Sequence, residues 1–277
     1  MTAISGAAVA VTGAASGIGR ALARKLAARG ADLALADRDE AGLASVAAEI
    51  GSARKVTVHR VDIGEPKEIA EFARSSIAAH PALNILINNA GVALLGAFSE
   101  IDQSQMEWLM NINFWGAVHA TRAFLPHLGA QREAHIVNLS SIFGIIGPPG
   151  QSAYAASKFA VRGFSESLRH ELQMAKSPVR LSVVHPGGVA TNIARNSRSG
   201  SGVTDNARRS QAIERFDALA RKSPEAAAIR IIRGIETNEP RILIGSDARF
   251  MDLLQRFRPA TYWSVLARRI EKAAAKK

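Results

Sequence analysis

Short apolar segments alternate along this 277-residue chain with longer segments of helical periodicity. Most of the short segments are runs of Val, Ile and Leu without polar alternation, which is typical of strands buried on both faces of a parallel sheet. A strand–helix–strand order repeated six times predicts an α/β fold, with a doubly wound sheet of about seven parallel strands and helices on both faces. The expected strands are 8–11, 33–36, 56–59, 83–87, 135–139, 181–184 and 242–244, and the expected helices are 17–28, 40–50, 65–79, 106–128, 153–174 and 224–236.

A glycine-rich turn follows the first expected strand and opens the first helix. It reads Thr12-Gly13-Ala14-Ala15-Ser16-Gly17-Ile18-Gly19, with the spacing GxxxGxG. Glycines permit a tight turn and a close approach of phosphate, and a helix that begins there directs free N–H groups and its positive dipole end at that phosphate. In this strand–turn–helix context the turn predicts a dinucleotide site. The expected contacts are Gly13, Ser16, Gly17, Ile18 and Gly19.

The second expected strand ends at Asp37, 18 residues after Gly19. A carboxylate at this spacing accepts hydrogen bonds from the adenosine ribose and repels a 2′-phosphate, so NAD is favoured over NADP. The neighbouring Arg38 supports NADP instead, because a guanidinium can pair with that phosphate or stack on adenine. The plainer alternative is that both residues are polar groups that close a strand.

Tyr154 and Lys158 lie at positions i and i+4 near the start of an expected helix, so their side chains face the same way. A phenol has a pKa of about 10 and is a poor base at neutral pH. A neighbouring ammonium favours the phenolate, which would suit Tyr154 to proton transfer with a substrate oxygen. Taken alone, the pair is better explained by a helix surface with an exposed Lys and a half-buried Tyr.

Other turns strengthen the catalytic interpretation. Ser141 ends the fifth expected strand, 13 residues before Tyr154. In a doubly wound sheet, ligands bind outside the carboxyl ends of the strands. The glycine-rich turn, Asp37, Ser141 and Tyr154 are therefore expected at one edge, together with the turns Asn88-Asn89-Ala90-Gly91 and His185-Pro186-Gly187-Gly188.

These motifs together resemble the classical short-chain dehydrogenase/reductase (SDR) family. The likeness covers roughly residues 6–245 and is carried by TGAASGIG at 12–19, NNAG at 88–91, YAASK at 154–158 and PGGVAT at 186–191. It implies a single Rossmann-like domain and an NAD(P)(H)-dependent oxidoreductase that interconverts a secondary alcohol and a ketone by hydride transfer. The implied catalytic residues are Asn113, Ser141, Tyr154 and Lys158.

The resemblance also implies a role for each of these residues. Tyr154 exchanges the proton on the substrate oxygen, Lys158 lowers the Tyr pKa and binds the nicotinamide ribose, and Ser141 fixes the reacting oxygen. Asn113 holds a water of the proton relay, a role for which Asn111 is the less favoured candidate. The implied cofactor contacts are Asp62 and Ile63 at adenine, Val189 and Thr191 at the nicotinamide carboxamide, and Asn89, Ala90, Gly91, Pro186 and Gly187, with Tyr154 and Lys158 shared.

Two segments are expected to shape the substrate pocket. Residues 142–149 are nearly all apolar, which favours a hydrophobic alcohol or ketone unless these side chains face the core. Residues 196–206 lack a period and are either a disordered surface loop or part of a mobile lid at about 192–216; their place near the site favours the lid. Four lid arginines could serve a charged substrate instead: Arg195, Arg198, Arg208 and Arg209.

The charge is concentrated at the C-terminus. Lys and Arg number 35 against 24 acids, a net charge of +11, and residues 249–277 carry +6 of it. We expect a catalytic domain over 1–248, lid included, and a basic helical extension over 249–277. A solvated face explains such a charge run most simply, and a tail that contacts anionic lipid, an acidic partner or nucleic acid is the alternative.

Several classes of protein are excluded or disfavoured. The absence of cysteine excludes disulfides, a thiol nucleophile and Cys-ligated metals, and no trusted metal-ligand spacing occurs among the seven histidines. No stretch approaches the roughly 20 apolar residues of a membrane span, so a cytoplasmic enzyme without a metal is expected.

We further expect a homodimer or homotetramer, with the long fourth and fifth helices at the interface, and no specific nucleic-acid partner. A non-catalytic dinucleotide sensor on the same fold is the alternative function.

Overall fold

The computed structural model describes the backbone of residues 1–274 and their side chains, apart from those of Asn206 and residues 269–274. Its centre is a seven-stranded sheet in the order β3-β2-β1-β4-β6-β7-β9, and every pair of neighbouring strands is parallel. The strands are β1 (Ala8–Thr12), β2 (Asp32–Asp37), β3 (Val56–Arg60), β4 (Leu83–Asn88), β6 (Ala134–Leu139), β7 (Val179–Pro186) and β9 (Arg241–Ile244). The predicted doubly wound α/β fold is confirmed.

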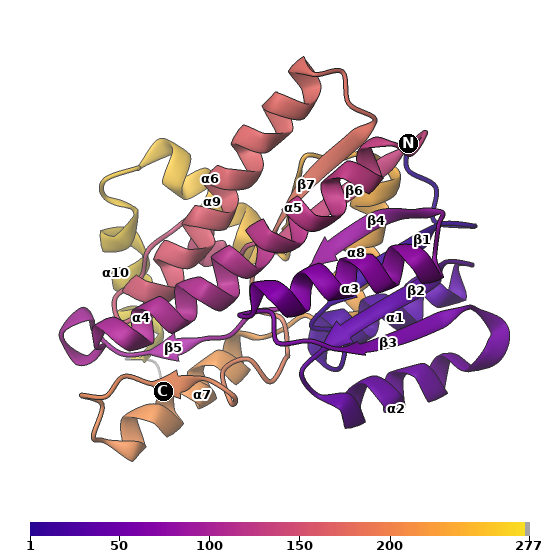
Figure 1. The fold of residues 1–277 in the computed structure, drawn as a ribbon. Helices are drawn as coiled ribbons and strands as arrows, with labels where there is room; N and C mark the ends of the chain where they lie inside the picture. Colours follow the sequence, from indigo (N-terminus) through magenta and orange to yellow (C-terminus); the bar gives the residue numbers. More distant parts are fainter. Residues whose placement is uncertain (275–277) are drawn as a thin grey trace.

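Helices cover both faces of this sheet (Figure 1). One face carries α1 (Gly17–Ala28), α2 (Glu40–Ile50) and α8 (Pro224–Glu236), and the other carries α3 (Pro66–Ala79), α5 (Gly116–Gly129) and α6 (Ser152–Met174). The strand interiors are apolar on both sides, because each side supports its own hydrophobic core. The chain winds outward from β1 to β3 and then returns to β4, so a switch point lies between β1 and β4.

The expected helix 106–128 is interrupted. It consists of α4 (Gln103–Met110), a π-helical turn η3 (Asn111–Trp115) and α5, in one continuous rod. A π turn inserts one extra residue per turn and often marks a functional site. Here it directs Asn113 inward, where its side chain is buried.

The lid segment contains regular structure that the sequence did not predict. A short parallel sheet joins β5 (Leu94–Leu95) to β8 (Arg198–Ser199), and α7 (Asn206–Leu219) follows. Three short 3₁₀ turns complete the connections: η1 (Gly51–Ala53), η2 (Phe98–Glu100) and η4 (Ile142–Gly144). The segment therefore packs as an ordered flap over the chain that follows β4.

The C-terminal extension forms two helices, α9 (Ser246–Phe257) and α10 (Tyr262–Ala274). The boundary expected between residues 248 and 249 lies inside α9. Both helices pack against η4 and β9 at one end of the sheet, through a cluster that includes Ile145, Ala248 and Leu266 (Figure 1). Between residues 1 and 274, none of the helices is both long enough and apolar enough to cross a membrane.

Candidate active site

The carboxyl ends of the strands bring the predicted motifs to one edge of the sheet. Gly13 follows β1, Asp37 ends β2, Asn89 follows β4 and Ser141 follows β6. Because neighbouring strands are parallel and in register, these positions share the edge at which the switch point between β1 and β4 opens. Tyr154 belongs to α6, which packs against β6 and η4 at this edge.

Asn89 holds the glycine-rich turn in place. Its side-chain amide donates to the carbonyls of Thr12 and Gly13, each at 2.9 Å, and its backbone N–H donates to the Thr12 hydroxyl at 3.1 Å. Gly13 has a φ of +66°, and a Cβ there would lie 2.8 Å from the Cα of Ala90. The turn therefore requires glycine for its conformation and for its contact with the segment after β4.

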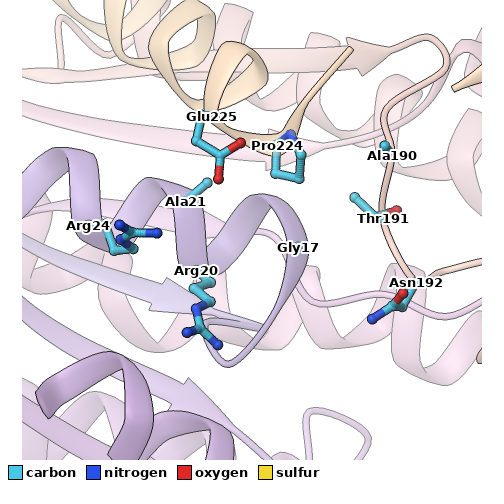
Figure 2. A pocket seen from close by; sticks show the side chains of 9 residues that line it. All are labelled: Gly17, Arg20, Ala21, Arg24, Ala190, Thr191, Asn192, Pro224 and Glu225. Atoms are coloured by element: carbon cyan, nitrogen blue, oxygen red, sulfur yellow. The ribbon is translucent and has the colours of Figure 1, made fainter. Parts of the chain in front are cut away.

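The start of α1 fits a phosphate group. Ser16 is the N-cap, and its exposed side chain makes no capping hydrogen bond, so the first N–H groups of the helix lack a side-chain partner. A cavity of about 180 Å³ opens beside this turn, and Figure 2 shows Gly17 and Thr191 on facing walls of it. A free helix start beside a cavity, with glycine at the point of approach, is the arrangement that a dinucleotide pyrophosphate requires.

The side chains of two predicted cofactor contacts pack in the hydrophobic core. Ile18 packs against the core beneath α1, and Val189 is buried in the same core. What they offer a ligand at the site is therefore their backbone. Val189 also forms a parallel bridge with Lys222, which fixes the segment that follows β7.

The Asp37 carboxylate braces the glycine-rich turn. One oxygen accepts from the backbone N–H of Ala15 at 3.0 Å and the other from that of Asp39 at 3.1 Å. Each oxygen retains a lone pair for a ribose hydroxyl. Arg38 beside it is exposed.

Asp62 and Ile63, for which the resemblance implies contacts with adenine, lie just beyond β3. Asp62 accepts from the backbone N–H of Gly64 at 2.8 Å, which shapes a tight turn there. Ile63 packs against the core beneath α3 and α5 and comes so close to Gly116 that a Cβ at that glycine would collide with it at 2.9 Å. Pro186 and Gly187 lie farther along the edge, where β7 ends.

Tyr154, Lys158 and Ser141 converge in the middle of the edge. The Lys158 side chain is buried, and its Nζ atom donates to the Leu139 carbonyl at 3.1 Å and lies 5.7 Å from the centre of the Tyr154 ring. The Ser141 hydroxyl accepts from the backbone N–H of Phe143 at 3.1 Å. The ring of Phe143 meets the Tyr154 ring edge-on, with centroids 6.1 Å apart.

Burial governs the ionisation of this group. It raises the pKa of Tyr154 to about 12, against a smaller lowering by a hydrogen bond with Ser141. Burial also lowers the pKa of Lys158 to about 8. At neutral pH the Tyr154 phenol is therefore protonated. Lys158 is still mostly an ammonium, but it loses its proton more readily than an ordinary lysine does. The expected lowering of the Tyr154 pKa by Lys158 is not among the causes that act in this state.

Asn113 fixes the chain beside Tyr154 from the π turn. Its side-chain oxygen accepts from the backbone N–H of Val92 at 2.8 Å, and its amide donates to the Val92 carbonyl at 3.0 Å and to the Ser157 hydroxyl at 3.1 Å. Asn111 donates instead to the Gly64 carbonyl, away from this group. The structure thus brings Asn113 to the site and leaves Asn111 outside it.

Two neighbours of the site received no individual role from the sequence, His185 and Asp247. The Nδ1 atom of the buried His185 lies 2.9 Å from the Ser141 carbonyl, to which it donates, because a carbonyl only accepts. Asp247 accepts from the backbone N–H of Gly188 at 2.7 Å. His185 belongs to the turn that the sequence places at this edge, and the contact of Asp247 follows only from the fold. Ser140 donates to the Lys158 carbonyl at 2.8 Å, which agrees with a structural role for it.

The lid contacts the site through α4. The Arg198 guanidinium lies over the Trp108 ring at 3.9 Å from its centre, and Gln105 exchanges hydrogen bonds with the backbone of Ser199 and Ser201. Trp108 packs in the same small apolar cluster as Tyr154. In the described part of the chain, no group of three His, Cys, Asp or Glu side chains is arranged to hold a metal ion.

Comparison with known proteins agrees with this geometry. The family model for short chain dehydrogenase matches residues 7–202. The chain is 40% identical over 276 residues to SadH of Mycobacterium tuberculosis, to which an oxidoreductase activity is ascribed, with 98% of each chain covered. It is also similar to a Burkholderia phymatum short chain dehydrogenase/reductase solved in complex with NAD (TM-score 0.84, 29% identity, 92% and 95% covered) and to a metagenomic short-chain oxidoreductase solved with NADP (TM-score 0.70, 29% identity, 88% and 98% covered).

Proposed function

Because the chain belongs to the short-chain dehydrogenase family, we propose that it interconverts a secondary alcohol and a ketone by hydride transfer with NAD(H) as its cofactor. The observation that carries this proposal is the convergence of Tyr154, Lys158 and Ser141 at the edge of the sheet, beside a turn that fits a pyrophosphate. A nicotinamide cofactor, when bound, supplies or accepts the hydride, and the protein supplies orientation and electrostatics.

The chain's own residues then handle the proton and the substrate oxygen. Tyr154, protonated at neutral pH, donates its proton to the oxygen of a ketone that is being reduced. Ser141 hydrogen-bonds the same oxygen and fixes its position. Lys158 lies beside the ring and stabilises the phenolate that remains. Asn113, whose side chain is fixed on Val92 and Ser157, is the residue proposed to hold the water of the proton relay.

The preference for NAD rests on Asp37. Its half-buried carboxylate is fixed by two backbone N–H groups, so it cannot swing away from a 2′-phosphate without losing both bonds. Arg38 is exposed and is the neighbouring residue that would favour NADP. Replacing Asp37 by Ser should shift the preference toward NADPH, because the repulsion is removed.

Support for an apolar substrate comes from Phe143, whose ring lies against Tyr154. Ile142, Ile145 and Ile146 face a core cluster with α9 and α10, so they do not carry this argument. Two lid arginines have acidic partners within the fold: Arg195 pairs with Asp217 and Arg208 with Glu100. Arg209 donates to lid carbonyls and Arg198 lies over Trp108, so all four arginines have partners within the fold.

The proposed homo-oligomer has an exposed apolar face available to it. Trp115 on η3 and Phe159 on α6 are 45% and 40% exposed, and a surface groove of about 540 Å³ runs beside Trp115 along α4. A second copy of the chain is the occupant that the family resemblance implies. Light scattering should give a dimer or tetramer, and Trp115→Glu should shift it toward monomer.

Helix α9 favours a second role at an anionic membrane surface. Its outer face exposes Leu253 and Phe257, at 55% and 81%, and the exposed Arg249, Arg256 and Arg258 flank them. Asp252, between them, is buried and pairs with both Arg241 and Arg256, so Arg249 and Arg258 are the arginines of this face without a carboxylate from Asp252. Apolar side chains ringed by arginine are the pattern of a helix that lies in a lipid interface. In a co-sedimentation experiment with vesicles that contain anionic lipid, we expect the wild type to pellet with the vesicles. The double variant Leu253→Gln/Phe257→Gln should stay in the supernatant. Binding of an acidic protein without vesicle binding would contradict the lipid proposal.

The test of the main proposal is nicotinamide absorbance during turnover, with NADH and NADPH in parallel and a panel of apolar ketones, then secondary alcohols in reverse. Turnover that prefers NADH is expected. A preference for NADPH would overturn the assignment of Asp37. Tight dinucleotide binding without turnover across the panel would instead support a non-catalytic sensor.

A further inference from the structure

The turn after β7 is fixed from outside the segment that matches the family model. Asp247, in the first turn of α9, accepts a hydrogen bond from the backbone N–H of Gly188 at 2.7 Å. The family match ends at residue 202, so this contact joins the extension to the Pro186–Thr191 turn, for which the nicotinamide contacts are proposed.

Two glycines make room for the Asp247 carboxylate. A Cβ at Gly187 or at Gly245 would collide with its oxygens. Gly245, the N-cap of α9, also has a φ of +99°, a backbone conformation that residues with a side chain rarely adopt. The carboxylate is thus enclosed between the turn and the start of its own helix, whose dipole favours a negative charge there.

The same turn is held by backbone bonds on its other sides. The N–H of Gly187 donates to the Ile244 carbonyl at 2.9 Å, and the N–H of Lys222 donates to the Gly188 carbonyl at 3.1 Å. Asp247 is the side chain that completes this set. A charged acceptor makes a stronger hydrogen bond than a neutral one, so its removal leaves the N–H of Gly188 without its acceptor.

We propose that Asp247 is a positioning residue, which sets the Pro186–Thr191 turn for the nicotinamide half of the cofactor. This inference rests on the proposed function. Strand β7 is separated from β1 by β4 and β6, so Gly188 lies on another part of the edge than Asp37, whereas Thr191, at the other end of the turn, faces Gly17 across the cavity beside the glycine-rich turn. Displacing the turn at Gly188 should therefore weaken nicotinamide binding and affect binding of the ADP-ribose part much less.

The experiment compares NADH with ADP-ribose, which lacks the nicotinamide. For Asp247→Ala we expect the Kd of NADH to rise at least tenfold and that of ADP-ribose to stay within twofold. Asp247→Asn retains an acceptor oxygen and should remain within threefold of wild type for both ligands. Ser246→Ala, at the exposed preceding residue, is the matched control and should change neither.

A second variant tests the same contact from the opposite side. Gly187→Ala places a methyl group against the Asp247 carboxylate and should also weaken NADH selectively. In the Asp247→Ala background this clash is relieved. The increase in the Kd of NADH in the double variant should therefore be smaller than the product of the increases in the two single variants. If Asp247→Ala fails to fold, Gly187→Ala alone still tests the selectivity.

Three outcomes would overturn the inference: NADH binding by Asp247→Ala within twofold of wild type, equal weakening of both ligands in Asp247→Ala and Gly187→Ala, or multiplicative effects in the double variant. Failure of the proposed cofactor site is distinguishable, since the wild type would then bind neither NADH nor ADP-ribose. A non-catalytic sensor would bind NADH without turnover, and the comparison of Kd values would still test Asp247.

Discussion

The Nζ atom of Lys158 lies 5.7 Å from the centre of the Tyr154 ring, while it donates a hydrogen bond to the Leu139 carbonyl. Burial acts on both groups in the direction that disfavours charge: it raises the Tyr154 pKa to about 12 and lowers the Lys158 pKa to about 8. At pH 7 the pair is therefore a neutral phenol beside an ammonium that burial destabilises. Polar groups of the bound cofactor and a polarised substrate are what would make the charged form favourable.

Replacing Tyr154 by Phe should abolish proton transfer and leave the pocket's shape intact. We expect kcat to fall by about 10²–10⁴-fold, the usual contribution of a general acid or base, with the Kd of NADH within twofold of wild type. Steady-state kinetics and a fluorescence titration with NADH measure the two quantities. The control is Tyr262→Phe, the other tyrosine in the chain, which should keep its kcat. Equal activity of the Tyr154 variant would refute the assignment.

Replacing Lys158 by Met should stabilise the cofactor-free protein while it removes activity. The side chain is 4% exposed, and its lowered pKa means that folding at neutral pH works against the ammonium. An apolar chain of similar length avoids that cost, so we expect a gain of about 1–3 kcal/mol in the free energy of unfolding. Urea denaturation at pH 7 without nucleotide measures it. A loss of stability there would show that the hydrogen bond to Leu139 outweighs the desolvation.

The sequence predicted the strands because their apolar runs are continuous and their ends carry Gly, Asn and Asp. Most helix bounds followed from their periodicity. The π turn at Asn113 was not predictable, since one inserted residue hardly changes the apolar pattern. Strands β5 and β8 hold two residues each and carry no periodicity at all. The contact of Asp247 with Gly188 joins residues 59 positions apart, so only the folded chain reveals it.

Acid should destabilise the protein through two buried histidines. Desolvation lowers the pKa of His135 to about 3 and that of His185 to about 4. In the unfolded chain these histidines bind protons below their ordinary pKa of 6.5, and in the folded chain they stay neutral down to about pH 4. Their full contribution to the free energy of unfolding is therefore present above pH 6.5 and is lost as the pH drops toward 4. At pH 5 each histidine should cost about 2 kcal/mol relative to pH 8.

Denaturation curves between pH 8 and pH 5 measure that slope. His135→Gln should be less stable than wild type at pH 8, because it disturbs the hydrogen bonds to Thr2 and Ser182, but its stability should depend less on pH. His170→Gln, at an exposed position, is the control and should keep the wild-type slope. An unchanged slope in His135→Gln would argue against this source of acid sensitivity.

Replacing Tyr262 by Phe should affect the substrate and not the cofactor. Its hydroxyl accepts from the backbone N–H of Gly147 at 2.9 Å, which ties α10 to the apolar loop after Ser141. Without this bond we expect the KM of a bulky apolar ketone to rise about 3–10-fold and stability to fall by about 1 kcal/mol. The Kd of NADH should not change. A KM at the wild-type value would show that α10 does not shape the pocket.

The pairing of β5 with β8 affects the timing of the proposed reaction. The lid is attached by main-chain bonds from Arg198 to the Ala93 carbonyl, from Gly200 to the Leu95 carbonyl and from Gly202 to the Glu100 carbonyl. In the proposed reaction, a ligand beneath the lid would leave only when these bonds part, so its residence time would depend on backbone pairing that side-chain substitutions in the pocket leave untouched. Variants that widen the pocket would then alter which molecule is accepted while each catalytic cycle keeps its pace.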